Sequence, residues 1–197
     1  MNVQSPTDIA GEYYLEDLPE LASGFKIDPA QGFRFFVTYG ALDRYGAGKW
    51  AVHENVVSFQ SSNQWPGKDF AMVGSTTTND NFITIRITDK NQNILRFAAA
   101  SIKKGERGSW QPADAKGYIH FPKQQVEVIA LLSEFSAERF SVFNVSNAAH
   151  NYFEFRFEPW IMEFFFNDFR LTIEKKGLRG KHPMLQGDGY FYKKRSR

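Results

Sequence analysis

Alternation of apolar and polar side chains with a period of two is the feature that most limits what this chain can fold into. It is clearest in residues 32–50, GFRFFVTYGALDRYGAGKW. Because successive side chains of a strand point to opposite faces, one face of the first half of this segment collects four residues: Phe33, Phe35, Val37 and Tyr39. A helix would scatter them. A second strand, 48–53, adds Trp50 and Val52, so the segment predicts a β-hairpin with one aromatic face.

The hairpin needs a turn, and residues 41–46 have the composition for one. Asp43 can hydrogen-bond to its own backbone, and Gly46 tolerates a positive φ. The same alternation returns in 82–88 and in 152–158, while helix signals are almost absent. Many short strands separated by turn signals are typical of a β-sandwich or β-barrel. The chain is therefore predicted to be all-β.

Two units are expected, since 197 residues suit one large or two small domains. The polar segment 75–81 is the candidate boundary between them. Alternation returns in two strands near the C-terminus, at 169–175 and 189–194, and these resemble the first unit more than the second. We therefore expect the units 1–78 with 166–197, and 79–165.

Two stretches of the second unit, ITIRITDKNQNILRFAAASI and ADAKGYIHFP, combine an alternating strand, an Asp-containing turn and a strand of small residues. An Asp-x-x-Gly turn, from Asp114 to Gly117, then precedes a short aromatic strand. This pattern resembles the carboxypeptidase regulatory-like, transthyretin-type β-sandwich over roughly residues 80–160. The resemblance implies a structural or adhesive module without catalytic residues of its own.

The first unit carries Gly11 and Tyr13 in its first strand, the turn sequence YGALD at 39–43, and then Gly48 and Trp50. In these features it resembles the N-terminal part of uncharacterised bacterial proteins with a lipocalin-like start. Too few strands precede residue 77 to close an eight-stranded barrel. We therefore expect a lipocalin-like partial barrel formed by both chain ends, with an Ig/transthyretin-like β-sandwich inserted between them.

Several kinds of chemistry are missing from the sequence. The chain has no cysteine, which excludes disulfides, thiol nucleophiles and thiolate metal sites. No Gly-x-Ser-x-Gly elbow or phosphate-binding loop occurs. The histidines lack the usual local ligand spacings: His53, His120, His150 and His182. We therefore predict no catalytic residue, no metal site and no cofactor.

The charge and hydropathy of the chain limit the kinds of binding partner to expect. The net charge is +2 with both signs interspersed, and the only concentrated basic run is 193–197, which is typical of a solvated chain end. No apolar run approaches the ~20 residues that a membrane helix needs. Neither nucleic-acid binding nor membrane insertion is expected. A periplasmic or secreted location follows from the resemblance alone, and a cytoplasmic one stays open.

The aromatic face of the hairpin is either plain core or the lining of an apolar pocket. On the second interpretation a non-catalytic protein holds a small apolar ligand against five residues: Phe33, Phe35, Tyr39, Trp50 and Val52. The alternative is a protein or glycan interaction module of the cell envelope that uses Trp65 and Trp110, each in a loop near a proline. An uncharacterised hydrolase is a third possibility.

Overall fold

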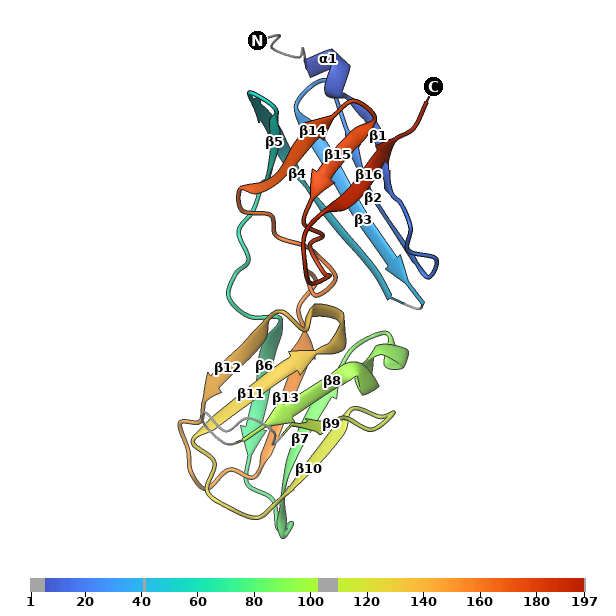
Figure 1. Ribbon diagram of the computed structural model, residues 1–197. Helices are drawn as coiled ribbons and strands as arrows, with labels where there is room; N and C mark the ends of the chain where they lie inside the picture. The colour runs from blue at the N-terminus through green and yellow to red at the C-terminus, as the bar shows by residue number, and fades with distance from the viewer. Residues whose placement is uncertain (1–5, 41, 103–109, 197) are drawn as a thin grey trace. The chain divides into compact units, whose positions relative to one another are not determined.

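The computed structural model describes residues 6–40, 42–102 and 110–196, and this part of the chain is all-β (Figure 1). It divides into two units, residues 1–65 with 162–197 and residues 66–161. The chain therefore passes from the first unit into the second between residues 65 and 66, and not between residues 78 and 79 as expected. The reason is that strand β6, Phe70–Thr76, pairs with β13, Tyr152–Phe157, inside the second unit. The polar residues 77–81 form the connection that follows β6 within that unit.

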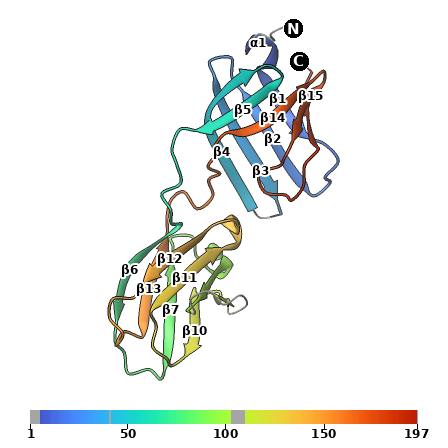
Figure 2. The same cartoon turned by 60° about the vertical axis from the view of Figure 1, so that its left-hand side comes forward.

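The first unit is a closed antiparallel barrel in the order β1-β16-β15-β14-β5-β4-β3-β2 (Figure 2). Its N-terminal elements are α1 (Pro6–Ile9), β1 (Gly11–Leu15), β2 (Leu21–Ile27), β3 (Gly32–Tyr39), β4 (Leu42–His53) and β5 (Val56–Ser61). Its C-terminal strands are β14 (Phe169–Glu174), β15 (Gly177–Gly180) and β16 (Tyr190–Lys194). Both ends of the chain therefore build one sheet, as the alternation in 169–175 and 189–194 predicts.

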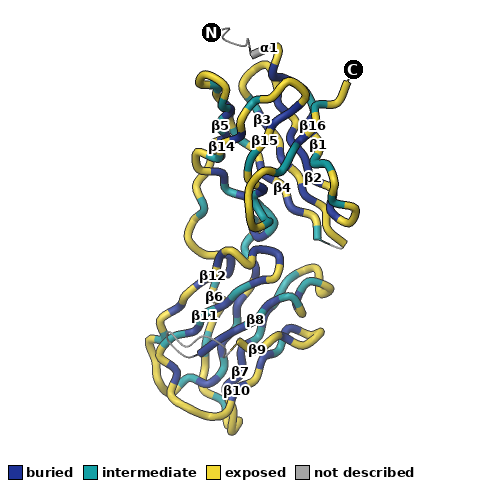
Figure 3. Tube along the Cα trace, in the orientation of Figure 1, coloured by how far each residue is buried: buried dark blue, intermediate teal, exposed yellow. Residues whose placement is uncertain are grey.

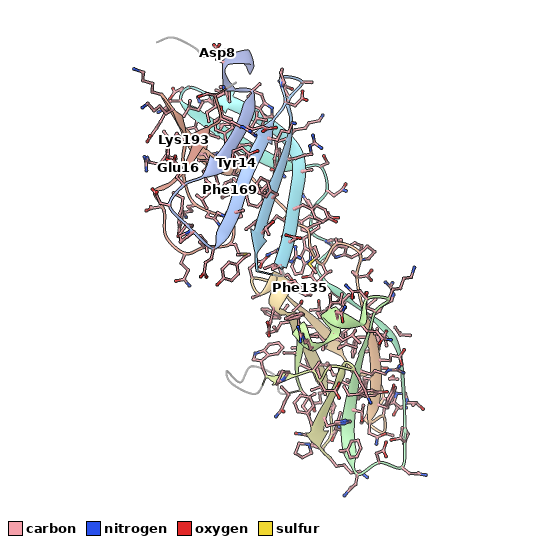
Figure 4. All side chains as sticks on the ribbon, turned by 90° about the vertical axis from the view of Figure 1, so that its right-hand side faces the viewer. Asp8, Tyr14, Glu16, Phe135, Phe169 and Lys193 are labelled. Atoms are coloured by element: carbon pink, nitrogen blue, oxygen red, sulfur yellow. The ribbon has the colours of Figure 1, made fainter. Side chains whose placement is uncertain are left out.

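The barrel closes where β1 meets β16, with Tyr13 opposite Lys194. Beside this seam the ammonium group of Lys193 donates to the carboxylate of Glu16 at 2.7 Å (Figure 4). The expectation of a partial barrel is wrong, because residues 177–180 form a further strand, β15, which pairs with both β14 and β16. That strand supplies the pairing needed to close the sheet.

The turn predicted at 41–46 is also wrong. Tyr39 pairs with Leu42 and Thr38 with Asp43, so residues 42–46 belong to β4. Asp43 is exposed on that strand, and only Gly40, with φ +58°, and residue 41, which lies outside the described residues, separate the strands. Pairing with β3 satisfies the backbone of 42–46 better than an isolated loop would.

The interior of the barrel is filled by aromatic rings. The rings of Phe25 and Phe59 stack with centroids 4.6 Å apart. Two further rings, of Phe164 and Phe166, come from the segment that follows the second unit. This segment is held to the barrel because the N–H of Phe164 donates to Tyr45 O at 2.7 Å, and the N–H of Ser61 donates to Phe166 O at 2.9 Å. We refer to residues 162–166 as the plug.

The second unit consists of two four-stranded sheets, β10-β7-β13-β6 and β12-β11-β8-β9. The remaining elements are β7 (Phe82–Thr88), η1 (Gln92–Phe97), β8 (Ala98–Ser101), β9 (Gln111–Pro112), β10 (Tyr118–Pro122), β11 (Val128–Ser133), η2 (Glu134–Ser136) and β12 (Phe140–Asn144). The sheets meet through buried side chains, as in the contact of Phe143 with Phe155 at 4.8 Å between centroids. Alternating buried and exposed stretches mark most of these strands (Figure 3). No helix within the described ranges is long and apolar enough to span a membrane.

Candidate functional site

Three of the predicted ligand-binding residues belong to the packed core of the barrel. Phe33, Phe35 and Trp50 are each at most 3% exposed. Phe33 and Phe35 both contact the ring of Phe166, with centroids 5.3 Å away in each case. The indole N–H of Trp50 donates to Asp28 O at 2.8 Å, which ties β4 to the β2–β3 turn. Their side chains are therefore enclosed by other protein groups.

The other two predicted ligand-binding residues, Tyr39 and Val52, are not among the fully buried core residues. Tyr39 is 49% exposed and is the last residue of β3. Val52 is half-buried near the opposite end of the barrel, one residue before β4 ends. The face of the hairpin that carries these five residues thus runs from the core to the rim of the barrel.

The two predicted surface tryptophans differ from each other. Trp110 is 37% exposed beside β9 in the second unit. Trp65 is half-buried at the end of the first segment of the barrel unit and is not without a partner. Of the two, Trp110 has more surface left for a partner.

An apolar groove of about 450 Å³ lies at the end of the barrel where Tyr39 is found. Three parts of the chain converge on it: the β1–β2 connection, the end of β3 and the β15–β16 connection. The lining residues are Leu18, Pro19, Glu20, Leu21, Tyr39, Met184 and Leu185. Glu20 is the one charged side chain among them, so the groove offers apolar contact with a carboxylate and a phenol as polar groups.

One wall of the groove is held in place by His182, which is buried beneath it. Nδ1 of His182 accepts the N–H groups of Met184 at 3.1 Å and Leu185 at 3.2 Å. Nε2 lies 3.1 Å from the hydroxyl of Ser23 on β2. Because Nδ1 accepts, the ring proton is on Nε2 and is donated to Ser23. The imidazole therefore links the β15–β16 connection to the barrel wall.

The proximity of Ser23 and His182 does not make a nucleophilic pair. A serine nucleophile needs a histidine nitrogen that accepts its proton, whereas here Nε2 donates and Ser23 Oγ donates onward to Phe36 O at 3.0 Å. Within the described ranges, no group of three or more His, Asp or Glu side chains is arranged to hold a metal ion.

Comparison with known proteins finds no match to this chain among family models, curated proteins or solved structures.

Sequence reasoning missed most of this groove. It identified Tyr39 but not Leu18, Met184 or Leu185, which lie in connections rather than in strands. A signal was present, since Met184 and Leu185 are adjacent apolar residues in a connection rich in Gly and polar residues. Apolar residues in such a connection need a partner surface, and here the barrel end provides it.

Burial of the neutral imidazole predicts a dependence of stability on pH. Desolvation lowers the pKa of His182 from 6.5 to about 4. Between these values the unfolded chain binds the proton and the folded chain does not, so the free energy of unfolding falls as the pH drops from about 6.5 to about 4. The contribution that is lost is about 3 kcal/mol.

Urea unfolding at pH 7, which is above both pKa values, and at pH 4.5, which lies between them, measures this change in the free energy of unfolding. The matched variant is His182→Gln, whose amide cannot titrate. It is expected to show a smaller loss of stability between the two pH values than the unmodified protein. Equal losses of stability in both proteins would show that His182 is not the group responsible.

Proposed function

We propose that the barrel unit binds a small apolar ligand in the groove at its end, not in its lumen. The observation that carries the proposal is the groove itself: about 450 Å³ of largely apolar space next to an exposed tyrosine. Pockets for small organic molecules are commonly of this size, apolar and provided with few polar groups. A molecule with an alkyl or aromatic body and one polar end fits this description.

The packing of the lumen supports the groove as the site. Phe25, Phe33 and Phe59 have centroids within 6.4 Å of one another. A ligand inside the barrel would have to displace such rings, and each buried aromatic side chain contributes several kcal/mol to stability. A ligand in the groove would displace only water from the side chains of Leu18, Leu185 and Tyr39.

The architecture supports finer assignments that remain proposals. A closed eight-stranded antiparallel barrel with a short helix before its first strand is compatible with a lipocalin-like binding unit. The two packed sheets of the second unit are compatible with a transthyretin-type module. A periplasmic or secreted location accords with both, and it rests on the resemblance alone.

A titration with the fluorescent probe N-phenyl-1-naphthylamine, followed by competition with laurate, tests the groove. We expect Leu185→Glu to weaken probe binding by at least about tenfold, because a carboxylate in the apolar wall must be desolvated when the probe binds. Phe36→Glu is the matched control, since Phe36 is 37% exposed on the outside of the barrel. Equal probe affinity in the Leu185→Glu variant and the unmodified protein would refute the proposal.

An exposed aromatic row favours a second function, recognition of a protein or glycan. Tyr14, Gly24, Phe36 and Tyr45 lie opposite one another across β1, β2, β3 and β4. Gly24 leaves space in which the ring of Phe36 approaches that of Tyr14, with centroids 6.1 Å apart. Exposed apolar patches of this kind often mark interaction sites.

Binding to a glycan array, measured for the unmodified protein and for Tyr45→Ala, tests this second function. Loss of array binding in the variant, while the groove still binds the fluorescent probe, would identify this row as the site.

A further inference from the structure

Among the described residues of the second unit, 66–102 and 110–161, one sheet edge lacks the usual protection against strand pairing. Edge strands are commonly protected by shortness, proline, bulges or charge. Strand β9 has two residues and ends in Pro112, β10 ends in Pro122, and β6 has a register shift opposite Glu154 and Phe155. Strand β12, Phe140–Asn144, has the sequence FSVFN and a regular register with β11. It contains no charge, proline, glycine or bulge.

The free side of β12 carries backbone groups directed away from its sheet. The N–H of Val145 donates to Glu127 O at 2.8 Å, which places this pair among those bonded across the β11–β12 ladder. In an antiparallel ladder the bonded residues alternate. The N–H and C=O groups of Phe140, Val142 and Asn144 therefore point away from β11, toward the side of β12 on which its sheet ends.

The outer face beside this edge is apolar. Phe140 is 59% exposed and Val142 is 41% exposed, where an antiparallel sheet normally presents polar side chains to water. Their neighbours on β11 are Leu132 and Ala130, which are half-buried on the same face. The edge thus combines available hydrogen-bonding groups with exposed apolar side chains.

We propose that β12 pairs antiparallel with β12 of a second copy of this chain across a two-fold axis. In that register Val142 faces its own counterpart, and Phe140 of each copy faces Asn144 of the other. In a symmetric pairing each strand faces an identical strand, so a charged residue at its centre would lie next to the same charge on the other copy. Strand β12 contains no charged residue and avoids this repulsion.

Cysteine crosslinking tests this register directly, because the chain contains no cysteine of its own. Facing residues that exchange both hydrogen bonds have Cα atoms about 5.5 Å apart, within the range that a disulfide spans. Mild oxidation of full-length protein carrying Val142→Cys is expected to give a covalent dimer that reductant separates. Val73→Cys, at a more exposed valine on the edge strand β6, is the control and is expected to remain monomeric.

Sedimentation measurements on proteins without cysteine complete the test. The unmodified chain is expected to be dimeric at roughly 100 µM, and Val142→Lys is expected to weaken dimerisation at least about tenfold by placing like charges together. Val73→Lys should leave the dimer intact, and unfolding curves check that both variants are folded. The proposal is overturned by a monomeric unmodified protein, by a dimer that survives Val142→Lys, or by equal crosslinking of the two cysteine variants.

Discussion

Replacing Phe166 by Ala is expected to lower the free energy of unfolding of the barrel by about 3–5 kcal/mol. Phe166 is 5% exposed and lies in the plug, and its ring is surrounded by other rings inside the barrel. The centroid distances to four of them are 6.1 Å for Phe25, 5.3 Å for Phe33, 5.3 Å for Phe35 and 5.4 Å for Phe169. The cavity left by the substitution cannot collapse fully, because the strands of a closed barrel are fixed by their hydrogen bonds.

A glycine on the barrel wall shows how closely this ring is fitted. A Cβ atom on Gly46 would lie 2.5 Å from the ring of Phe166, so β4 leaves out a side chain where the ring packs. In the Phe166→Ala background a larger residue at position 46 should therefore recover part of the lost stability. Gly46→Val alone should instead destabilise the barrel by about 1–3 kcal/mol through overpacking.

Native-state hydrogen exchange separates the barrel from the second unit in these measurements. Amide protection should fall in β3 of the Phe166→Ala variant and remain unchanged in β11. Phe36→Ala, on the outside of the same strand, should cost under about 1 kcal/mol. A loss for Phe166→Ala as small as that for Phe36→Ala would contradict the role of the plug as core.

Asp69→Ala is expected to destabilise the second unit by about 3–5 kcal/mol, because it removes one partner of a buried ion pair. Nε of Arg139 donates to the carboxylate of Asp69 at 2.8 Å, and the side chains are 8% and 2% exposed. The hydroxyl of Ser136 donates to the same oxygen at 2.9 Å. Removing the carboxylate leaves the guanidinium buried without its counter-charge.

The backbone of Asp69 is also held by hydrogen bonds in this region. Its N–H donates to the hydroxyl of Ser141 at 2.7 Å, and its C=O accepts the N–H of Glu158 at 2.9 Å. Arg139 also donates to Ile161 O at 3.2 Å. The ion pair thus joins the segments with which the chain enters and leaves the second unit.

A matched variant in the same unit separates burial from charge. Glu154 pairs with Arg86 at 3.4 Å, but its partner is 40% exposed, so Glu154→Ala should cost under about 1 kcal/mol. Chemical denaturation, with exchange protection of β11 amides as the local measurement, compares the two variants. Equal effects of Asp69→Ala and Glu154→Ala would show that burial of the pair adds nothing.

The strands could be predicted from the sequence because their signal is local. Phe33, Phe35 and Val37 alternate with exposed residues, and the structure places them inside the barrel as that pattern indicates. No comparable local pattern in the sequence indicates which strands pair with each other. Strand β6 pairs with β13 about 80 positions away in the chain, so the polar connection after β6 looked like a boundary.

The site was only partly predictable, for a related reason. Whether an aromatic face lines a pocket or a core depends on what fills the space before it, and here Phe164 and Phe166 arrive from beyond the second unit. Arg44 shows the same limitation. It is 2% exposed, with its guanidinium 3.6 Å from the ring centroid of Phe164 and a hydrogen bond to Glu163 O at 3.3 Å. Nothing near Arg44 in the sequence indicates that partner.

Assembly of one barrel from two separated segments of chain has a consequence for biosynthesis. A ribosome completes residues 66–161 before it adds β14, β15 and β16. The inserted unit can therefore fold during translation, while the strands β1–β5 wait with two open edges. Such edges are the places where nascent chains associate wrongly. The interval between these two folding events is where we expect this protein to depend most on chaperones.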